Sequence, residues 1–147
     1  MPPEESLASD ALHKFLLIFR HLRQKARDTD KQGIRGRHLA VLQFLQEKHT
    51  ATVTEIQDYL YISASTASTL IKQLEDAGYV MRIRSEEDNR VVIVEPTPAG
   101  RELAQTTTVA GIGLLRRRLP TLPDERLQNI DQALADIIEL MEVSDTE

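Results

Sequence analysis

Apolar residues recur at intervals of three and four along several stretches of the chain, which is the pattern of amphipathic helices. The first stretch runs from about Ser6 to Arg27, the second from about Gly36 to Lys48, and the last from about Asp124 to Glu142. Residues 98–119 are predicted to form one more helix, which has proline at its first position and stops before Pro120. The chain is therefore predicted to be mainly helical.

Two shorter helices with capping signals are predicted in the middle of the chain. Thr52 and Glu55 have the spacing of a capping box, which opens a helix that ends near Leu60. Ser63 is a good N-cap for the following helix, and Gly78 stands where that helix would stop.

The pattern becomes extended after Gly78. Residues 79–84 end in an alternating pattern, and residues 90–94 are rich in β-branched side chains. The turn composition of residues 85–89 predicts a β-hairpin, which Pro96 ends. Helix, short turn, helix and hairpin are the elements of a winged helix–turn–helix. We therefore predict a mainly α fold with a small β-hairpin wing.

The charge distribution restricts any nucleic-acid contact to a local surface. The net charge is −5, and residues 10–48 carry nine Lys and Arg against four Asp and Glu. Residues 49–100 carry four basic against eight acidic side chains, and residues 101–147 carry five against nine. The protein as a whole is therefore not attracted to phosphate, so a DNA-binding face must be local.

Composition and motifs argue against several other classes of protein. The chain has no cysteine, which excludes disulfides, thiolate zinc sites and thiol redox sensing. Its four histidines are scattered, and it has neither a phosphate-binding glycine loop nor a nucleophile motif. We therefore expect no catalytic residue, no metal site and no cofactor. Without a long apolar run or a signal-peptide pattern, a cytoplasmic protein with no membrane partner is expected.

The helix after Ser63 begins with small polar residues, which suits the groove-entering helix of a helix–turn–helix. Hydroxyl groups there can reach phosphates or base edges, and wing arginines can reach the minor groove. Asp88 and Arg90 are expected to pair and to stiffen the wing. A Ser/Thr-rich helix in an unrelated domain and a hairpin with ordinary surface arginines are the alternatives. The predicted DNA-binding residues are Ser63, Ser65, Thr66, Ser68, Thr69, Lys72, Arg82, Arg84, Asn89 and Arg90.

These stretches resemble the MarR family (multiple antibiotic resistance regulators). The matching residues are Ile62–Ser68, Leu70-Ile71, Leu74-Glu75, Gly78-Tyr79-Val80 and Asp88-Asn89-Arg90, with Thr97 and Gly100 at the expected offsets. The resemblance implies a single domain over residues 1–147. Within it, residues 36–96 form the winged helix–turn–helix DNA-binding part, and residues 5–30 and 98–143 form the helical dimerisation part. It also implies a transcription regulator, typically a repressor, that binds a pseudo-palindromic operator in double-stranded DNA as a homodimer.

The apolar faces of the first and last helices agree with dimerisation. An intramolecular core is the alternative, but three long apolar faces exceed what one small winged unit can cover. The predicted dimerisation residues are Leu12, Phe15, Leu16, Phe19, Leu127, Ile130, Leu134, Ile137 and Ile138. The resemblance further implies a small aromatic or anionic effector that binds between the two parts and releases the DNA. The candidate pocket residues are His13, Phe15, Arg20, His38 and Tyr59.

The predicted recognition helix has fewer basic residues than is usual in the family. Thr69 stands where relatives often have arginine, so Lys72 is the one basic residue of the predicted recognition helix. We therefore expect weak sequence-independent binding with a shallow salt dependence. A protein-interaction module that keeps the fold without DNA affinity is the second hypothesis. A basic segment could add phosphate contacts or be a solvated surface; it comprises Arg20, Arg23, Lys25, Arg27, Lys31, Arg35 and Arg37.

Overall fold

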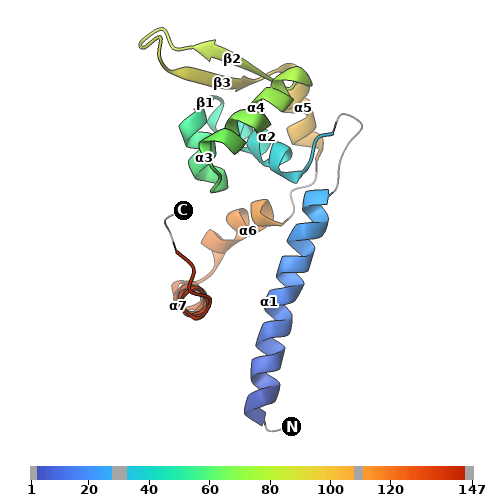
Figure 1. The fold of residues 1–147 in the computed structure, drawn as a ribbon, viewed down its shortest axis with the longest axis vertical. Coiled ribbons are helices and arrows are strands. Elements are labelled where there is room, and N and C mark those ends of the chain that lie inside the picture. The colour runs from blue at the N-terminus through green and yellow to red at the C-terminus, as the bar shows by residue number, and fades with distance from the viewer. Residues whose placement is uncertain (1–2, 28–32, 108–110, 145–147) are drawn as a thin grey trace. The chain divides into compact units, whose positions relative to one another are not determined.

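The computed structural model describes residues 3–27, 33–107 and 111–144, and the chain divides into two compact units, Met1–Val109 and Ala110–Glu147 (Figure 1). The elements of the first unit are α1 (Pro3–Arg27), α2 (Gly36–Lys48), β1 (Ala51–Thr52), α3 (Val53–Leu60), α4 (Ala64–Asp76), β2 (Val80–Arg84), β3 (Val92–Pro96) and α5 (Pro98–Thr106). The second unit contains α6 (Ile112–Arg118), a 3₁₀ turn (Leu119–Thr121) and α7 (Asp124–Leu140). The predicted mainly helical fold with a β wing is confirmed.

The capping signals in the sequence are present in the structure. Thr52 Oγ1 accepts from the Glu55 backbone N–H at 3.1 Å, and Glu55 Oε1 accepts from the Thr52 N–H at 3.1 Å. Ser63 Oγ accepts from the Thr66 N–H at 3.2 Å and caps α4. Gly78, after the end of α4, has a φ of 84°, which few residues other than glycine adopt readily. The predicted starts of α3 and α4 are therefore confirmed.

The prediction of a single helix over residues 98–119 is wrong. The helix α5 ends at Thr106, and α6 begins at Ile112 after Gly111, whose φ is 58°. Thr107 has extended backbone angles, and its hydroxyl donates to the Leu103 carbonyl at 2.6 Å. Threonine hydroxyls compete in this way with helical hydrogen bonds, and β-branched residues disfavour helices. The apolar spacing that predicted one helix continues along the sequence, but the hydrogen bond of Thr107 and the backbone angle of Gly111 separate α5 from α6.

The sheet has three strands in the order β1–β3–β2, one more than the sequence predicts. The hairpin pairs Val80 with Pro96 and Arg84 with Val92, and Arg90 precedes its second strand. The additional strand, β1, pairs Ala51 with Val94. It is two residues long and runs directly into the Thr52 cap, so no alternating pattern reveals it.

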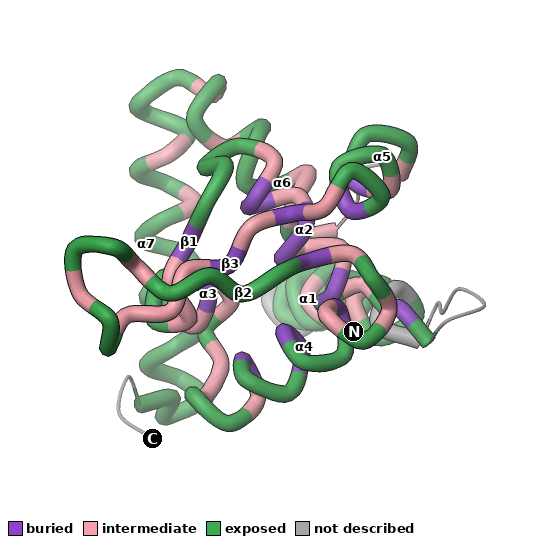
Figure 2. Tube along the Cα trace, turned by 90° about the horizontal axis from the view of Figure 1, so that it is seen from above, coloured by how far each residue is buried: buried purple, intermediate pink, exposed green. Residues whose placement is uncertain are grey.

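The core of the first unit forms where α2 meets α3, α4, α5 and β3. Figure 2 shows buried positions on α2, α4 and the sheet. The fully buried large side chains are Val41, Leu42, Leu45, Ile56, Ile71, Leu74 and Val94. Aromatic stacking adds to this core, because the rings of Phe44 and Tyr59 lie 4.2 Å apart. None of the described helices is long and apolar enough to cross a bilayer.

His38 is a buried polar residue that connects two helices of this core. Its side chain is 5% exposed, and its Nδ1 accepts from the Arg35 backbone N–H at 3.1 Å. Because Nδ1 is an acceptor, the ring proton lies on Nε2, which donates to Gln73 Oε1 at 2.7 Å. His38 therefore caps the start of α2 and holds the last turn of α4 to it.

We predict that Gly100→Ala destabilises the first unit. A Cβ at this position would overlap the backbone carbonyl of Tyr79, which also accepts from the Thr97 N–H at 3.0 Å. Because backbone must move, the free energy of unfolding should fall by about 2 kcal/mol or more, as for other overpacked sites. Urea unfolding measures the change. The exposed Ala99→Ser change on the same helix should have little effect, and equal stability of the two variants would contradict the prediction.

We predict a measurable coupling between His38 and Gln73. Replacing His38 with alanine removes two hydrogen bonds at a buried position, so it should lower the free energy of unfolding by about 2 kcal/mol. Gln73→Ala should cost less because residue 73 is exposed. The double variant should be about 1 kcal/mol more stable than additivity predicts, since the shared bond is lost only once. Strict additivity in urea unfolding would contradict the coupling.

Candidate nucleic-acid interface

The hydroxyl residues of α4 divide into a capping pair and an exposed group. Ser63 Oγ caps the helix and also donates to Thr66 Oγ1 at 2.9 Å. Thr66 is half-buried, whereas Ser65, Ser68 and Thr69 are exposed. Ser63 and Thr66 therefore serve mainly to begin the helix. Ser65 Oγ shares a hydrogen bond of 3.2 Å with Ser63 Oγ, but all three residues of the exposed group are accessible to a ligand.

The exposed face of α4 consists of short side chains. Thr69 Oγ1 donates to the Ser65 carbonyl at 2.9 Å, which leaves its methyl group and lone pairs facing solvent. The Ser68 hydroxyl makes no hydrogen bond with any described residue, so it can donate or accept freely. The opposite face is buried through Ala67, Leu70, Ile71 and Leu74. This arrangement presents a narrow polar ridge, which is the shape that enters a major groove.

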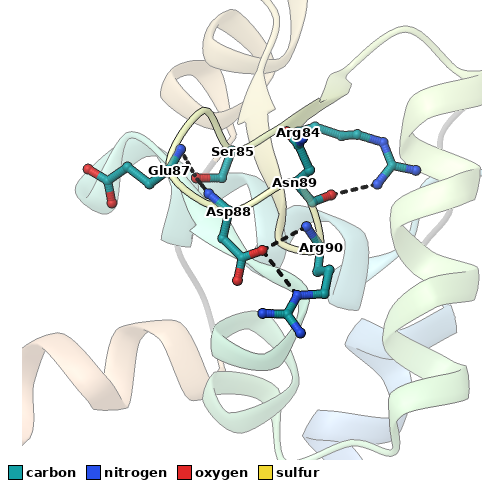
Figure 3. Close-up of polar contacts among 6 residues, drawn as sticks. All are labelled: Arg84, Ser85, Glu87, Asp88, Asn89 and Arg90. Atoms are coloured by element: carbon teal, nitrogen blue, oxygen red, sulfur yellow. Dashed lines mark hydrogen bonds and ion pairs between the residues drawn. The ribbon is translucent and has the colours of Figure 1, made fainter.

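The wing ends in a tightly bonded turn (Figure 3). Ser85 Oγ accepts from the backbone N–H groups of Glu87 and Asp88, at 3.2 and 3.4 Å. The Val91 N–H donates to the Asp88 carbonyl at 2.9 Å and closes the turn. These contacts fix the direction in which the side chains at the tip project.

Two arginines of the wing have different roles in the structure. Arg84 Nη1 donates to the Asn89 backbone carbonyl at 2.7 Å and braces the turn (Figure 3). Asp88 Oδ1 accepts from the Arg90 backbone N–H at 3.0 Å and lies 3.3 Å from Arg90 Nε. The predicted Asp88–Arg90 pair is therefore confirmed. The Arg90 side chain is still 92% exposed, so its guanidinium is available to an external anion.

The remaining two predicted cations pair with acids of α4. Arg82 lies opposite the buried Val94, on the core-facing side of the hairpin, and its Nε is 3.5 Å from Glu75 Oε1. Lys72 Nζ is 3.6 Å from Asp76 Oδ2. Both pairs are partly exposed, so each is weak. Glu75 and Asp76 were not predicted as partners from the sequence, although the four-residue spacing of Lys72 and Asp76 is a signal for the second pair.

The candidate effector residues do not gather in one place. His13 and Arg20 line a hollow along α1, together with Leu16, Leu17, Phe19 and Arg23. The guanidinium of Arg23 lies over the Phe19 ring, 5.1 Å from its centre. His38 bonds Gln73 and Tyr59 stacks on Phe44, and neither lines this hollow. Half-buried Phe15 does not line it either.

Apolar side chains remain exposed on both units. On α1, Leu12 is 58% exposed, and Leu16 and Phe19 are each 51% exposed. On α7, where no residue is buried, Leu134 and Ile138 are about half exposed. Four further residues are intermediate: Phe15, Leu127, Ile130 and Ile137. Each helix thus presents an apolar face that its own unit does not cover.

The described residues of the basic segment are divided between two helices. Arg20 and Arg23 lie on α1, whereas Arg35 and Arg37 are exposed at the start of α2. The side chains of Lys25, Arg27 and Lys31 lie outside the described residues. Among the residues that the structure describes, no group of three or more His, Asp or Glu side chains could hold a metal ion.

Two sequence relatives from Bacillus subtilis are named as regulators. The organic hydroperoxide resistance transcriptional regulator is 35% identical over 71 residues, which cover 48% of this chain and 48% of the relative. The uncharacterized HTH-type transcriptional regulator YfiV is 31% identical over 97 residues, which cover 66% of this chain and 61% of the relative. The match thus spans about half to three fifths of the length of these relatives.

A solved structure and a family profile agree with the fold. The crystal structure of the S. aureus MepR–DNA complex superposes with a TM-score of 0.62 at 20% identity, covering 88% of this chain and 96% of that chain. The MarR family profile matches residues 37–92, which include α2, the helix–turn–helix and the wing turn. These matches and the winged architecture make the chain similar to MarR-family regulators, above all over the winged helix–turn–helix of residues 37–92.

Proposed function

We propose that the protein is a sequence-specific DNA-binding transcription regulator, acting as a repressor in the cytoplasm. The observation that carries this proposal is the polar ridge of α4 beside a rigid wing that ends in the exposed Arg90. The sequence relatives named as transcriptional regulators, and the neighbour solved with DNA, support it.

The two elements would contact DNA in different ways. Ser65, Ser68 and Thr69 would face base edges in the major groove, where hydroxyls bond donors or acceptors and the threonine methyl packs on thymine. Arg90 would lie in or beside the minor groove, where a narrow groove concentrates negative potential. Ser63 and Thr66 would act mainly by fixing the start of α4, because their hydroxyls bond each other.

We also propose that two copies bind a pseudo-palindromic operator. The exposed apolar faces of α1 and α7 support dimerisation, since water-exposed leucine, isoleucine and phenylalanine gain free energy when covered. A two-fold dimer would place two copies of α4 in successive major grooves, about 34 Å apart. The predicted dimerisation residues of both helices would lie in this interface.

The hollow on α1 is the proposed effector site. His13, Arg20 and Arg23 offer polar and cationic groups next to the Phe19 ring, which suits a small aromatic or anionic compound. Such a compound would release DNA by binding one spacing of the two α4 helices more tightly than the other.

A protein-interaction module is the second candidate function. It is favoured by the excess of acidic residues over residues 49–100 and by the carboxylates paired with Lys72 and Arg82. Its partner would be a protein, and binding to DNA would then be weak and independent of sequence.

The test is an anisotropy titration against duplexes tiled from the region upstream of the gene, repeated across a salt series. We expect saturable binding to one fragment. Arg90→Ala should weaken it and make the salt slope shallower by about 0.9, the effect of one lost phosphate contact. Arg101→Ala, an exposed change on α5, is the control. Uniformly weak binding to every fragment would favour the interaction module instead.

Dimerisation has a separate test. Ile138→Glu places a charge in the exposed apolar face of α7 and should raise the dimer Kd at least tenfold, equivalent to about 1.4 kcal/mol. Sedimentation equilibrium measures the change. Gln128→Glu adds the same charge at an exposed polar position of α7 and should leave the Kd nearly unchanged. A monomeric wild-type protein, or an unchanged Kd for Ile138→Glu, would contradict the proposal.

A further inference from the structure

Three of the cations expected at the DNA already have a carboxylate beside them. The pairs are Lys72–Asp76 at 3.6 Å, Arg82–Glu75 at 3.5 Å and Arg90–Asp88 at 3.3 Å. The first two acids differ from the third. Asp88 also accepts from a backbone N–H and so shapes the wing, whereas the Glu75 and Asp76 carboxylates contact only the cations among the described residues.

Asp76 lies on the exposed ridge of α4 itself. Ser65, Thr69, Lys72 and Asp76 are separated by four, three and four residues, so they share one face of the helix. The side chains of Lys72 and Asp76 are 69% and 65% exposed. Any phosphate that approaches Lys72 therefore approaches the Asp76 carboxylate as well.

Glu75 has the corresponding position on the side of α4 that faces the wing. Its side chain is 39% exposed and that of Arg82 is 35% exposed, so both still reach solvent. The pair connects α4 to β2, next to the groove-facing ridge. A phosphate that bound Arg82 would compete with Glu75 for the same guanidinium.

We propose that Glu75 and Asp76 are specificity-determining residues that restrain sequence-independent attraction to phosphate. This inference rests on the proposed DNA-binding function. By neutralising Arg82 and Lys72, the two carboxylates reduce the number of effective phosphate contacts. Phosphate contacts carry no direct sequence information, so reducing them lowers binding to all DNA and leaves discrimination to the base-facing hydroxyls.

This mechanism requires that the Glu75–Arg82 and Lys72–Asp76 ion pairs be weak. Exposed pairs are typically worth less than about 1 kcal/mol, and helical pairs four residues apart less still. A correctly seated operator can therefore displace the carboxylates at small cost, because base contacts supply additional free energy. Binding to a random sequence depends almost entirely on phosphate contacts, so it would use Lys72 and Arg82 more than the operator complex does and would bear more of the repulsion.

The experiment compares wild type with Glu75→Gln, Asp76→Asn and the double variant, using a random-sequence duplex and the duplex best bound in a selection. Each freed cation should steepen the salt slope by about 0.9, roughly a threefold change between 50 and 200 mM salt. Affinity for the random duplex should rise most in the double variant, and the ratio of selected to random affinity should fall. Thermal unfolding by circular dichroism confirms that the variants fold.

Asp131→Asn is the matched control, since it removes the same charge from an exposed position on α7, in the other compact unit. If the Asp76 and Glu75 variants match this control in slope and affinity, the inference is wrong while the proposed function stands. Loss of discrimination at a single base pair, with unchanged binding to random DNA, would instead identify Asp76 as a base reader and overturn the inference. If neither wild type nor the double variant binds DNA even at low salt, both the inference and the proposed function fail.

Discussion

The burial of α2 among the elements around it is the constraint on which the winged unit depends. Val41 and Leu45 of this helix are 0% exposed and Leu42 is 1% exposed, and α3, α4, α5 and β3 all pack against it. Because α4 has its apolar face on this core, the direction of its polar face is decided by Leu70, Ile71 and Leu74. The exposed residues of α4 can therefore vary without loss of the fold, and the orientation of the ridge is set by buried residues.

Two polar contacts hold the flanks of α4, and they differ in strength. Gln73 accepts from the buried His38 at 2.7 Å on the side of α2. Glu75 lies 3.5 Å from the half-exposed Arg82 on the side of the wing. A short bond from a buried donor resists exchange, whereas a solvent-exposed ion pair exchanges readily with salt or phosphate. The helix is thus fixed relative to α2, and its connection to the wing is the one that an incoming anion can alter.

The sequence predicts local signals well and contacts between distant segments poorly. Capping at Thr52 and Ser63 depends on side chains three residues apart, so the starts of α3 and α4 were predictable. The strand β1, the Glu75–Arg82 pair and the His38–Gln73 bond each join residues whose proximity arises only after packing. The break between α5 and α6 was missed for a different reason. Apolar periodicity continued through it, but the Thr107 hydroxyl and the positive φ of Gly111 ended the helix locally.

An acidic protein that recognises DNA must obtain its affinity from something other than overall charge. Residues 49–100 carry four more acidic than basic side chains, so long-range attraction cannot concentrate the protein on DNA.

Two sources of affinity for DNA remain. One is the set of proposed base contacts from the short hydroxyl side chains of α4, which would act only on a matching sequence. The other is the proposed dimerisation through the apolar faces of α1 and α7, because two linked winged units would raise the effective concentration of the second contact. Both sources would favour a correctly spaced pair of half-sites over random DNA, which lacks matching base contacts for either winged unit. The acidic excess of residues 49–100 is therefore consistent with a regulator that binds random DNA weakly and discriminates well between sequences.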